Sequence, residues 1–391
     1  MSAITNASND LPGNPLTQLS LDQLRQRTSA KWRDHPADVL PLWVAEMDVL
    51  PAEPIAKAVT DALASGDTGY PGGTAYPEAV AAFAAARWNW NVDPGRIRTM
   101  PDMMRGVVEM LELVTRRDDA VVINCPVYPP FYRFAALNGR KVVEAPLGPD
   151  HRIDFAALAA AFELALGRGG RAAYLLCSPH NPTGTVHTRA ELARVARLAA
   201  DYGVSVIADE AHAPLVAPGT EFTPYLTVPG TEESFAVTSA AKAWNLPGLL
   251  AAVAVAGPAA AADLARVPRE MAGASHVNAT AHAAAFREGG PWLDALLVGL
   301  EANRCHLAAL LAEHLPAVRY SPQPGCYLAW LDCRGLGLGD DPAAAFLERG
   351  RVALNSGLPF GTGGAGHVRL NYATSPEILT EAVERMAATV R

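Results

Sequence analysis

The central part of the chain repeats short apolar runs, each followed by a longer stretch with helical period. Such near-continuous apolar runs are typical of strands that are buried on both faces of a sheet. They lie at Arg96–Met100, Ala120–Asn124, Lys141–Pro146, Ala172–Cys177, Val204–Ala208, Phe235–Thr238 and Leu250–Val255. This alternation predicts an α/β fold, in which a mostly parallel, seven-stranded type of sheet is covered by helices on both faces.

Helices are predicted where apolar positions recur with a period near 3.6 residues. In the first half of the chain they are Glu53–Ser65, Tyr76–Trp88, Met103–Thr115, Pro130–Leu137, Asp154–Ala165 and Thr188–Tyr202. After about Pro291 the predicted order is helix Trp292–His314, two-residue alternation in Val318–Leu331, helix Pro342–Arg349, strands near Val352–Asn355 and His367–Asn371, and a helix from Pro376. This α+β pattern is typical of a second, smaller domain.

The length and the change of pattern predict how the chain divides into domains. A chain of 391 residues is too long for one simple core. We expect residues 1–45 to form an N-terminal arm and part of the small domain, residues 46–288 to form the large domain, and residues 289–391 to form the small C-terminal domain.

Composition narrows the class of protein. Half of the residues are hydrophobic and 18% are charged, and the net charge of −8 argues against nucleic acid or an anionic membrane as a partner. Pro247 and Gly248 interrupt the longest apolar run, so no membrane span is predicted. The five cysteines contain no CxxC pair, and residues 1–20 contain no apolar signal segment. These features favour a cytoplasmic protein without disulfides.

Polar residues follow several predicted strands, at the edge where ligands collect in open α/β sheets. These segments are Pro126–Pro130, Ser178–Gly184, Asp209–His212 and Ser239–Lys242. Taken singly, each has a structural explanation, because Asn-Pro-Thr-Gly is a good turn, Asp209 could cap a helix and Lys242 could be a solvated loop lysine. Taken together, they match the requirements of one cofactor, pyridoxal phosphate.

The cofactor ring requires several partners. Lys242 stands among small and apolar residues, which lower the proton affinity of an amine, and it is the candidate for covalent attachment. Asp209 is the candidate carboxylate that keeps the ring nitrogen protonated. We expect Asn181 to donate a hydrogen bond to the phenolate oxygen and Tyr128 to stack on the ring.

The cofactor phosphate requires a helix N-terminus and a hydroxyl group. The backbone amides of Met103 and Met104 and the hydroxyl of Ser239 are the candidates. Asp102 directly precedes this helix. Because a carboxylate that pointed inward would repel the phosphate, we expect the Asp102 side chain to point away from it. An amino-acid substrate also carries a carboxylate, for which Arg369 offers a bidentate guanidinium.

The same residues, in this order, resemble the fold-type I pyridoxal-phosphate enzymes of the class I/II aminotransferase superfamily, from about Lys31 to the C-terminus. Within that superfamily, the chain is most similar to the MalY/PatB cystathionine β-lyase (cysteine-S-conjugate lyase) family. The motifs that carry the resemblance are Leu42–Asp48, Gly69–Tyr70, Pro126–Phe131, Ser178–Gly184, Asp209–His212, Lys242–Gly248, Trp292–Asp294, Tyr327–Asp332 and Arg369–Asn371.

The resemblance implies further contacts. It implies a homodimer with shared sites, in which Tyr70 reaches the phosphate of the neighbouring subunit and lies near the substrate. It also places His212 beside the cofactor and Trp43 beside the substrate. No partner histidine or cysteine lies at ligand spacing from His212, so we predict no metal site.

The implied reaction is α,β-elimination from cystathionine or another cysteine S-conjugate, with Lys242, Asp209 and Tyr128 as the catalytic set. Lys242 removes the Cα proton, a thiolate leaves from Cβ, and hydrolysis gives pyruvate and ammonia. An aminotransferase, or a decarboxylating or deaminating enzyme that acts on an S-conjugate in specialised metabolism, remains an alternative. A regulatory protein that retains the cofactor is a further alternative, from a different class.

Three departures from the family pattern leave the substrate open. Leu250 stands where the transaminases often carry a phosphate-binding arginine, and Asp102-Met103-Met104 replaces a turn that is usually Gly-Val-Val in the lyases. Ala241 replaces the hydroxyl residue that often precedes the lysine.

A glycine-rich segment near the end of the chain matches a pattern that is found in dinucleotide-binding sites. The segment Gly361–Gly366 satisfies the GxGxxG pattern, but it lies about 25 residues from the end of the chain and leaves no room for a βαβ unit. We therefore predict a flexible loop beside the substrate carboxylate in place of a dinucleotide site.

Overall fold

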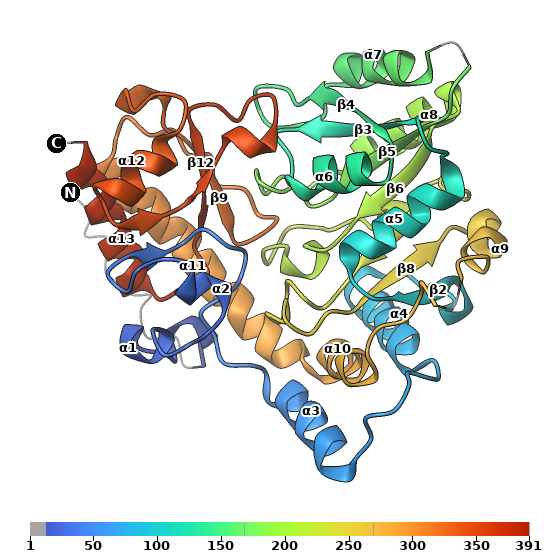
Figure 1. The fold of residues 1–391 in the computed structure, drawn as a ribbon, viewed down its shortest axis with the longest axis horizontal. Helices are drawn as coiled ribbons and strands as arrows, with labels where there is room; N and C mark the ends of the chain where they lie inside the picture. The colour runs from blue at the N-terminus through green and yellow to red at the C-terminus, as the bar shows by residue number, and fades with distance from the viewer. Residues whose placement is uncertain (1–12, 168, 269, 391) are drawn as a thin grey trace.

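The computed structural model describes residues 13–167, 169–268 and 270–390. Its centre is a seven-stranded sheet with the order β2-β8-β7-β6-β5-β3-β4 (Figure 1). The strands are β2 (Ile97–Met100), β3 (Ala120–Cys125), β4 (Lys141–Pro146), β5 (Ala172–Cys177), β6 (Ser205–Asp209), β7 (Phe235–Thr238) and β8 (Ala252–Ala256). Within this sheet β8 pairs antiparallel with both of its neighbours, and the other pairings are parallel. The predicted α/β fold and its mostly parallel sheet are confirmed.

Both faces of this sheet are buried, which explains why its strands are apolar at successive positions. In β3, Val122 belongs to one hydrophobic core, whereas its neighbours Val121 and Ile123 belong to the other. The helices that pack against the two faces are α5 (Met103–Val114), α6 (Pro130–Leu137) and α9 (Ala261–Leu264) on one side, and α4 (Ala75–Trp88), α7 (Phe155–Leu166) and α8 (Arg189–Tyr202) on the other.

The C-terminal part of the chain forms a separate antiparallel sheet in the order β11-β12-β9. The elements of this part of the chain are α11 (Gly290–His314), β9 (Leu328–Asp332), α12 (Pro342–Glu348), β10 (Val352–Ala353), β11 (Asn355–Ser356), β12 (His367–Asn371) and α13 (Pro376–Thr389). By length and composition α11 could cross a membrane, but it packs against α13 and buries leucines such as Leu296 and Leu307, as core helices do.

The N-terminal segment lies beside this C-terminal part (Figure 1). It contains α1 (Leu21–Leu24), α2 (Ala30–Arg33) and β1 (Leu40–Pro41). Because β1 pairs in parallel with β10, we propose the domain division expected above, in which the first 45 residues join residues 289–391 and residues 46–288 form the large domain. Residues 1–12 of the expected arm lie outside the described residues.

Several elements differ from the prediction, and two of these differences are the largest. The sequence did not reveal α10 (His276–Glu288), which packs against α3 (Glu53–Ser65) and α4 with an alanine-rich surface. The alternation in Val318–Leu331 suggested a longer strand, whereas only β9 forms, with a single bridge from Arg319 to Asp332. The intervening Ser-Pro-Gln-Pro-Gly sequence cannot continue a ladder, because proline has no backbone donor.

Candidate active site

The residues singled out in the sequence converge at the carboxyl ends of the parallel strands. Asp209 ends β6 and lies in register with Cys177 at the end of β5, and Lys242 lies in the turn after β7. Arg369 comes from β12 in the C-terminal part, yet its guanidinium reaches Asn181 in the turn after β5. The site is therefore built where the two parts of the chain meet.

Lys242 occupies surroundings that favour the neutral amine. Its Nζ donates a hydrogen bond to the carbonyl oxygen of Ala45 at 3.2 Å. Desolvation, followed by the positive charge of Arg369, lowers the pKa of Lys242 to about 8, although the carboxylates of Asp209 and Glu46 oppose the shift. A neutral amine is a nucleophile toward an aldehyde and a base, so the site suits both tasks.

Asp209 is a buried carboxylate beside this lysine. Its Oδ1 accepts a hydrogen bond from the backbone amide of Ala211 at 3.0 Å. Burial raises the pKa of Asp209 to about 6, although the Ala211 amide and the charge of Lys242 act in the opposite direction. A cationic ring nitrogen placed against this carboxylate would keep it ionised.

Arg369 is a buried guanidinium whose contacts are all uncharged. Its Nη1 donates to Oδ1 of Asn181 at 3.1 Å and its Nη2 donates to the carbonyl of Trp43 at 3.2 Å. The guanidinium carbon also lies 5.2 Å from the ring centroid of Phe360. Within the described residues its Nε has no hydrogen-bond partner. Burial lowers the pKa of Arg369, and its unneutralised charge fits an incoming carboxylate.

The aromatic residues frame the same site. The backbone amide of Tyr128 donates to the carbonyl of Asn181 at 3.0 Å, which ties the loop after β3 to the loop after β5. The ring of His212 meets that of Tyr327 edge-on at 6.0 Å. Burial and then the charges of Lys242 and Arg369 lower the pKa of His212 to about 3, so its imidazole is neutral.

Backbone carbonyls of the segment Trp43–Glu46 hold several of these side chains. The Trp43 carbonyl binds Arg369, so Trp43 contributes to the site through its backbone. The Ala45 carbonyl accepts from both Lys242 and the hydroxyl of Tyr327, the latter at 3.0 Å. Asn371 donates to the carbonyls on either side of Ala45. This segment therefore orients the lysine and the arginine together.

The predicted phosphate position lies at the N-terminus of α5. The amides of Met103 and Met104 belong to the first turn, where no carbonyl of the helix can accept from them. The expectation that Asp102 points away is wrong, because its Oδ1 caps the helix and accepts from the amide of Arg105 at 2.9 Å. An N-cap carboxylate satisfies an amide of the first turn, which explains its position.

Ser239 is fully buried and its hydroxyl already has partners within the chain. It donates to the carbonyl of Ala251 at 2.7 Å and accepts from the amide of Ala241 at 3.0 Å. A phosphate would compete with Ala251 for the hydroxyl proton, so the structure gives Ser239 a different partner from the predicted one.

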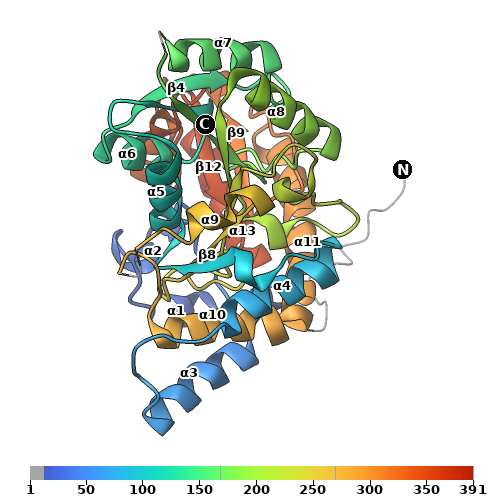
Figure 2. The ribbon, with the colours of Figure 1, turned by 90° about the vertical axis from the view of Figure 1, so that its right-hand side faces the viewer.

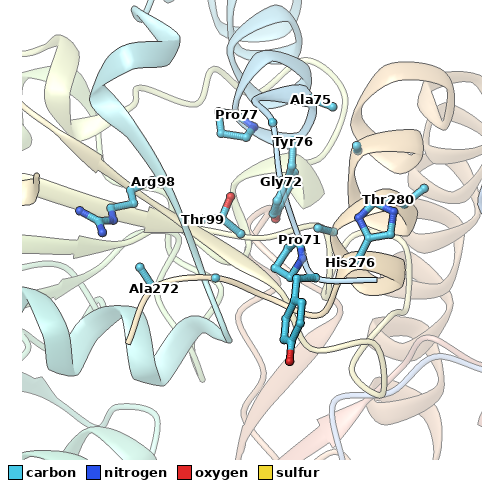
Figure 3. Close-up of a pocket in the computed structure, with 15 residues that line it drawn as sticks. Pro71, Gly72, Ala75, Tyr76, Pro77, Arg98, Thr99, Ala272, His276 and Thr280 are labelled. Carbon is cyan, nitrogen blue, oxygen red and sulfur yellow. The ribbon is translucent and has the colours of Figure 1, made fainter. Parts of the chain in front are cut away.

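Tyr70 does not join the group around Lys242. It is fully exposed in the loop between α3 and α4 and lines a hollow of about 680 Å³. Arg98, Thr99 and His276 lie around the same hollow (Figure 3). The predicted contact of Tyr70 is with the phosphate of a neighbouring subunit, so it stays a prediction for the dimer.

Several residues of the site were not identified as functional from the sequence. Tyr327 and Asn371 lie inside two of the family motifs, and that membership was the signal available for them. Ala45 acts through its carbonyl and Phe360 through its ring beneath Arg369. Ala45 also lies inside a family motif, Leu42–Asp48, but neither residue type carries reactive groups that would suggest a role.

Comparison with known proteins defines the class of protein. Residues 37–386 match the family described as aminotransferase class I and II. A Mycobacterium leprae (strain TN) protein named "Putative cystathionine beta-lyase" is 57% identical over 96% of this chain and 98% of its own length. The cystathionine beta-lyase of Corynebacterium glutamicum is 33% identical over 95% of this chain and 99% of its own length.

A solved structure gives the same result for the fold. It comes from Corynebacterium diphtheriae and is described as a "putative plp-dependent beta-cystathionase". It matches this chain with a TM-score of 0.90 and 32% identity, covering 95% of this chain and 98% of its own. The chain belongs to the class I and II aminotransferase family. Within it, the resemblance to the cystathionine β-lyases stated from the motifs is confirmed.

The residues at the site fit pyridoxal phosphate. Lys242 can attach an aldehyde, Asp209 can face a ring nitrogen, and the first turn of α5 offers amides to a phosphate. In the described part of the chain, Arg369 Nε and His212 Nδ1 are buried without partners. A buried polar atom left unpaired costs about 1–3 kcal/mol, so these atoms indicate a polar ligand.

The lowered pKa of Lys242 predicts how its reactivity depends on pH. When pyridoxal phosphate is added to cofactor-free protein, the rate of its covalent attachment to Lys242 should increase with pH, with a midpoint at about pH 8. The reason is that the neutral amine is the nucleophile. Borohydride trapping across a pH series measures this rate, and Lys242→Ala provides the blank. Arg369→Gln should move the midpoint upward, because it removes a positive charge that disfavours the ammonium. A wild-type midpoint near the ordinary value of 10.5 would contradict the desolvated environment.

Proposed function

We propose that the chain is a pyridoxal-phosphate-dependent carbon–sulfur β-lyase. It acts on a small amino-acid substrate, cystathionine or another cysteine S-conjugate, and releases a thiol, pyruvate and ammonia. One observation carries this proposal: a lysine of lowered pKa, a buried carboxylate and an unneutralised guanidinium share one site. The cystathionine beta-lyase of Corynebacterium glutamicum, similar over nearly the whole chain, supports the reaction class.

Each side chain around the ring has a distinct task. Lys242 provides the amine for covalent attachment, and Asp209 holds a proton on the ring nitrogen. Because Asn181 Oδ1 already accepts from Arg369, its Nδ2 is the group that donates to the phenolate oxygen. Tyr128 stacks on the ring, with the neutral imidazole of His212 beside the cofactor. When bound, pyridoxal phosphate supplies an electron sink for the charge that develops at Cα.

At the phosphate, the amides of Met103 and Met104 are the principal donors. The helix dipole of α5 adds to their attraction for an anion. Ser239 joins them only if its hydroxyl gives up the carbonyl of Ala251. Asp102 reduces this attraction, because its carboxylate caps the same helix.

The substrate is oriented by Arg369 and deprotonated by Lys242. Arg369 binds the carboxylate in a bidentate manner, which fixes the rotation about the bond to Cα and selects the bond that breaks. Lys242 Nζ then takes the proton from Cα, and the thiolate leaves from Cβ. The Ala45 carbonyl keeps Nζ directed into the site while Trp43 contributes its carbonyl to Arg369.

Product analysis tests the reaction class. The holoenzyme is incubated with L-cystathionine and with several S-alkyl cysteines, and thiol and pyruvate are followed together with the visible spectrum of the cofactor. A β-lyase releases thiol and pyruvate in equal amounts without an added 2-oxo acid. The aminotransferase alternative, which shares every cofactor contact, predicts that turnover requires a 2-oxo acid and that without one the cofactor is left as pyridoxamine phosphate.

Substitution of Asp209 tests the role of its carboxylate. Asp209→Ala should lower kcat/KM for an S-substituted cysteine by about a hundredfold or more, because the ring nitrogen loses the charge that keeps it protonated. Tyr128→Phe should cost far less, since its stacking survives. Both variants are compared with wild type by thiol release at saturating cofactor. Wild-type turnover by Asp209→Ala would contradict the assignment.

We further propose a homodimer in which Tyr70 completes the phosphate site of the partner. Tyr70 and Leu63 are both exposed, and α3, which carries Leu63, projects from the body of the chain (Figure 2). The hollow beside Tyr70 and the exposed Leu250 supply further surface for a second copy. An exposed tyrosine and exposed leucines are suited to a self-complementary interface between two copies of the chain.

Complementation tests this shared site. Tyr70→Ala and Lys242→Ala should each be nearly inactive as homodimers. When they are coexpressed, mixed dimers contain one site with both native residues, so activity should return to about a quarter of the wild-type value. Cofactor content and mass are measured on the same sample. Mixed dimers without recovered activity would place Tyr70 outside the partner's site.

We also infer a cytoplasmic location. None of the five cysteines forms a disulfide, and four of them are buried. Free buried thiols are typical of a reducing compartment.

A further inference from the structure

A group of hydrogen bonds joins the two parts of the chain near Arg369. Glu144 of β4 accepts from Thr362 through both the backbone amide, at 3.3 Å, and the hydroxyl. The hydroxyl of Tyr132 on α6 donates to the same carboxylate. We call Tyr132, Glu144 and Thr362 the Glu144 latch. It connects the edge of the seven-stranded sheet to the glycine-rich loop before β12.

The Glu144 latch fixes the backbone of the residue that supports Arg369. The carbonyl of Phe360 accepts from the amide of Val127 at 3.0 Å and lies 3.2 Å from the hydroxyl of Tyr132. The ring of Phe360 packs against Trp330, with ring centroids 5.1 Å apart, and lies beneath the guanidinium. The position of this ring therefore depends on contacts made by the large sheet.

The latch requires glycine at position 361, the first glycine of the loop. A Cβ atom added to Gly361 would lie 1.7 Å from the hydroxyl oxygen of Tyr132 and 2.4 Å from Oε1 of Glu144. Gly361 also has a φ of +88°, which other residues rarely adopt. Gly361, the first glycine of the GxGxxG pattern, thus allows the close approach of two side chains, and the loop is held by the latch at this point.

The latch carries a full charge at neutral pH. Burial acts to raise the pKa of Glu144, but the hydrogen bonds from Thr362 and Tyr132 hold it below its ordinary value. Hydrogen bonds to an ionised carboxylate are stronger than those between neutral groups. A charged latch can therefore hold the loop firmly against the sheet.

We propose that the Glu144 latch positions Arg369 for the substrate carboxylate by holding Phe360 against the guanidinium. The inference rests on the proposed function, because it takes Arg369 as the carboxylate anchor. Glu144 and Thr362 do not touch the substrate, so they act as positioning residues. Their loss should weaken the recognition of the carboxylate and leave the proton transfer at Lys242 intact.

Two matched variants test the latch. Thr362→Val removes the hydroxyl donor at nearly constant shape, and Thr362→Ser retains it. For each holoenzyme, kcat and KM are measured with an S-alkyl cysteine and with its carboxamide, which lacks the anionic carboxylate. The ratio of kcat/KM for acid over amide should fall about tenfold in Thr362→Val, through the KM for the acid, and stay near wild type in Thr362→Ser.

Glu144→Gln provides an independent variant and should lower the same ratio. Arg369→Lys calibrates the measurement, because it alters the anchor itself. Unchanged ratios in Thr362→Val and Glu144→Gln, beside a reduced ratio in Arg369→Lys, would overturn the latch and leave the proposed function standing. An unchanged ratio in Arg369→Lys would overturn the role of Arg369 and the latch with it.

General damage to the fold is distinguished by the same assay. A loss shared equally by acid and amide would indicate a structural role alone and would overturn the proposal. Should Glu144→Gln fail to fold, Tyr132→Phe removes one donor to the same carboxylate and should lower the ratio by a smaller factor.

Discussion

Burial of two positive charges beside one buried carboxylate is the constraint on which the site depends. Within the described residues, the guanidinium of Arg369 contacts an amide oxygen, a backbone carbonyl and an aromatic ring, and Lys242 contacts a carbonyl. Asp209 is the buried carboxylate of the site, and burial raises its pKa to about 6, which favours the neutral form. Unneutralised charge in a low-dielectric site is costly, so the site favours a ligand that brings anions. A phosphate-bearing cofactor and an amino-acid carboxylate meet that requirement.

The site needs both parts of the chain, because neither part carries all three of these charged side chains. Parallel strands place Asp209 and Lys242 at one edge of the large sheet, whereas β12 delivers Arg369 from the C-terminal part. The segment Trp43–Glu46 crosses between them and binds both cations through its carbonyls. Since β1 pairs with β10, this segment is itself fixed to the C-terminal part. Relative movement of the two parts would therefore change the positions of the Lys242 and Arg369 side chains together.

The sequence predicted what local patterns encode. Apolar runs located the seven strands, and polar residues after them located Asp209, Asn181 and Lys242. The sequence could not predict contacts between distant residues, such as the hydrogen bond between Asn181 and Arg369, which are 188 positions apart. It also could not predict the role of Ala45, which acts through a backbone carbonyl that every residue possesses. The sequence also did not reveal which groups already have hydrogen-bond partners within the chain. Asp102 caps α5, and the hydroxyl of Ser239 donates to the carbonyl of Ala251.

The crystal structure of the holoenzyme with an unreactive S-alkyl cysteine analogue tests the central claim most directly. The account predicts that the ring nitrogen lies within hydrogen-bond distance of Asp209, and that the analogue's carboxylate forms two hydrogen bonds with Arg369. It also predicts that Lys242 Nζ lies beside Cα of the analogue. A carboxylate bound away from Arg369, or a ring nitrogen without contact to Asp209, would contradict the account.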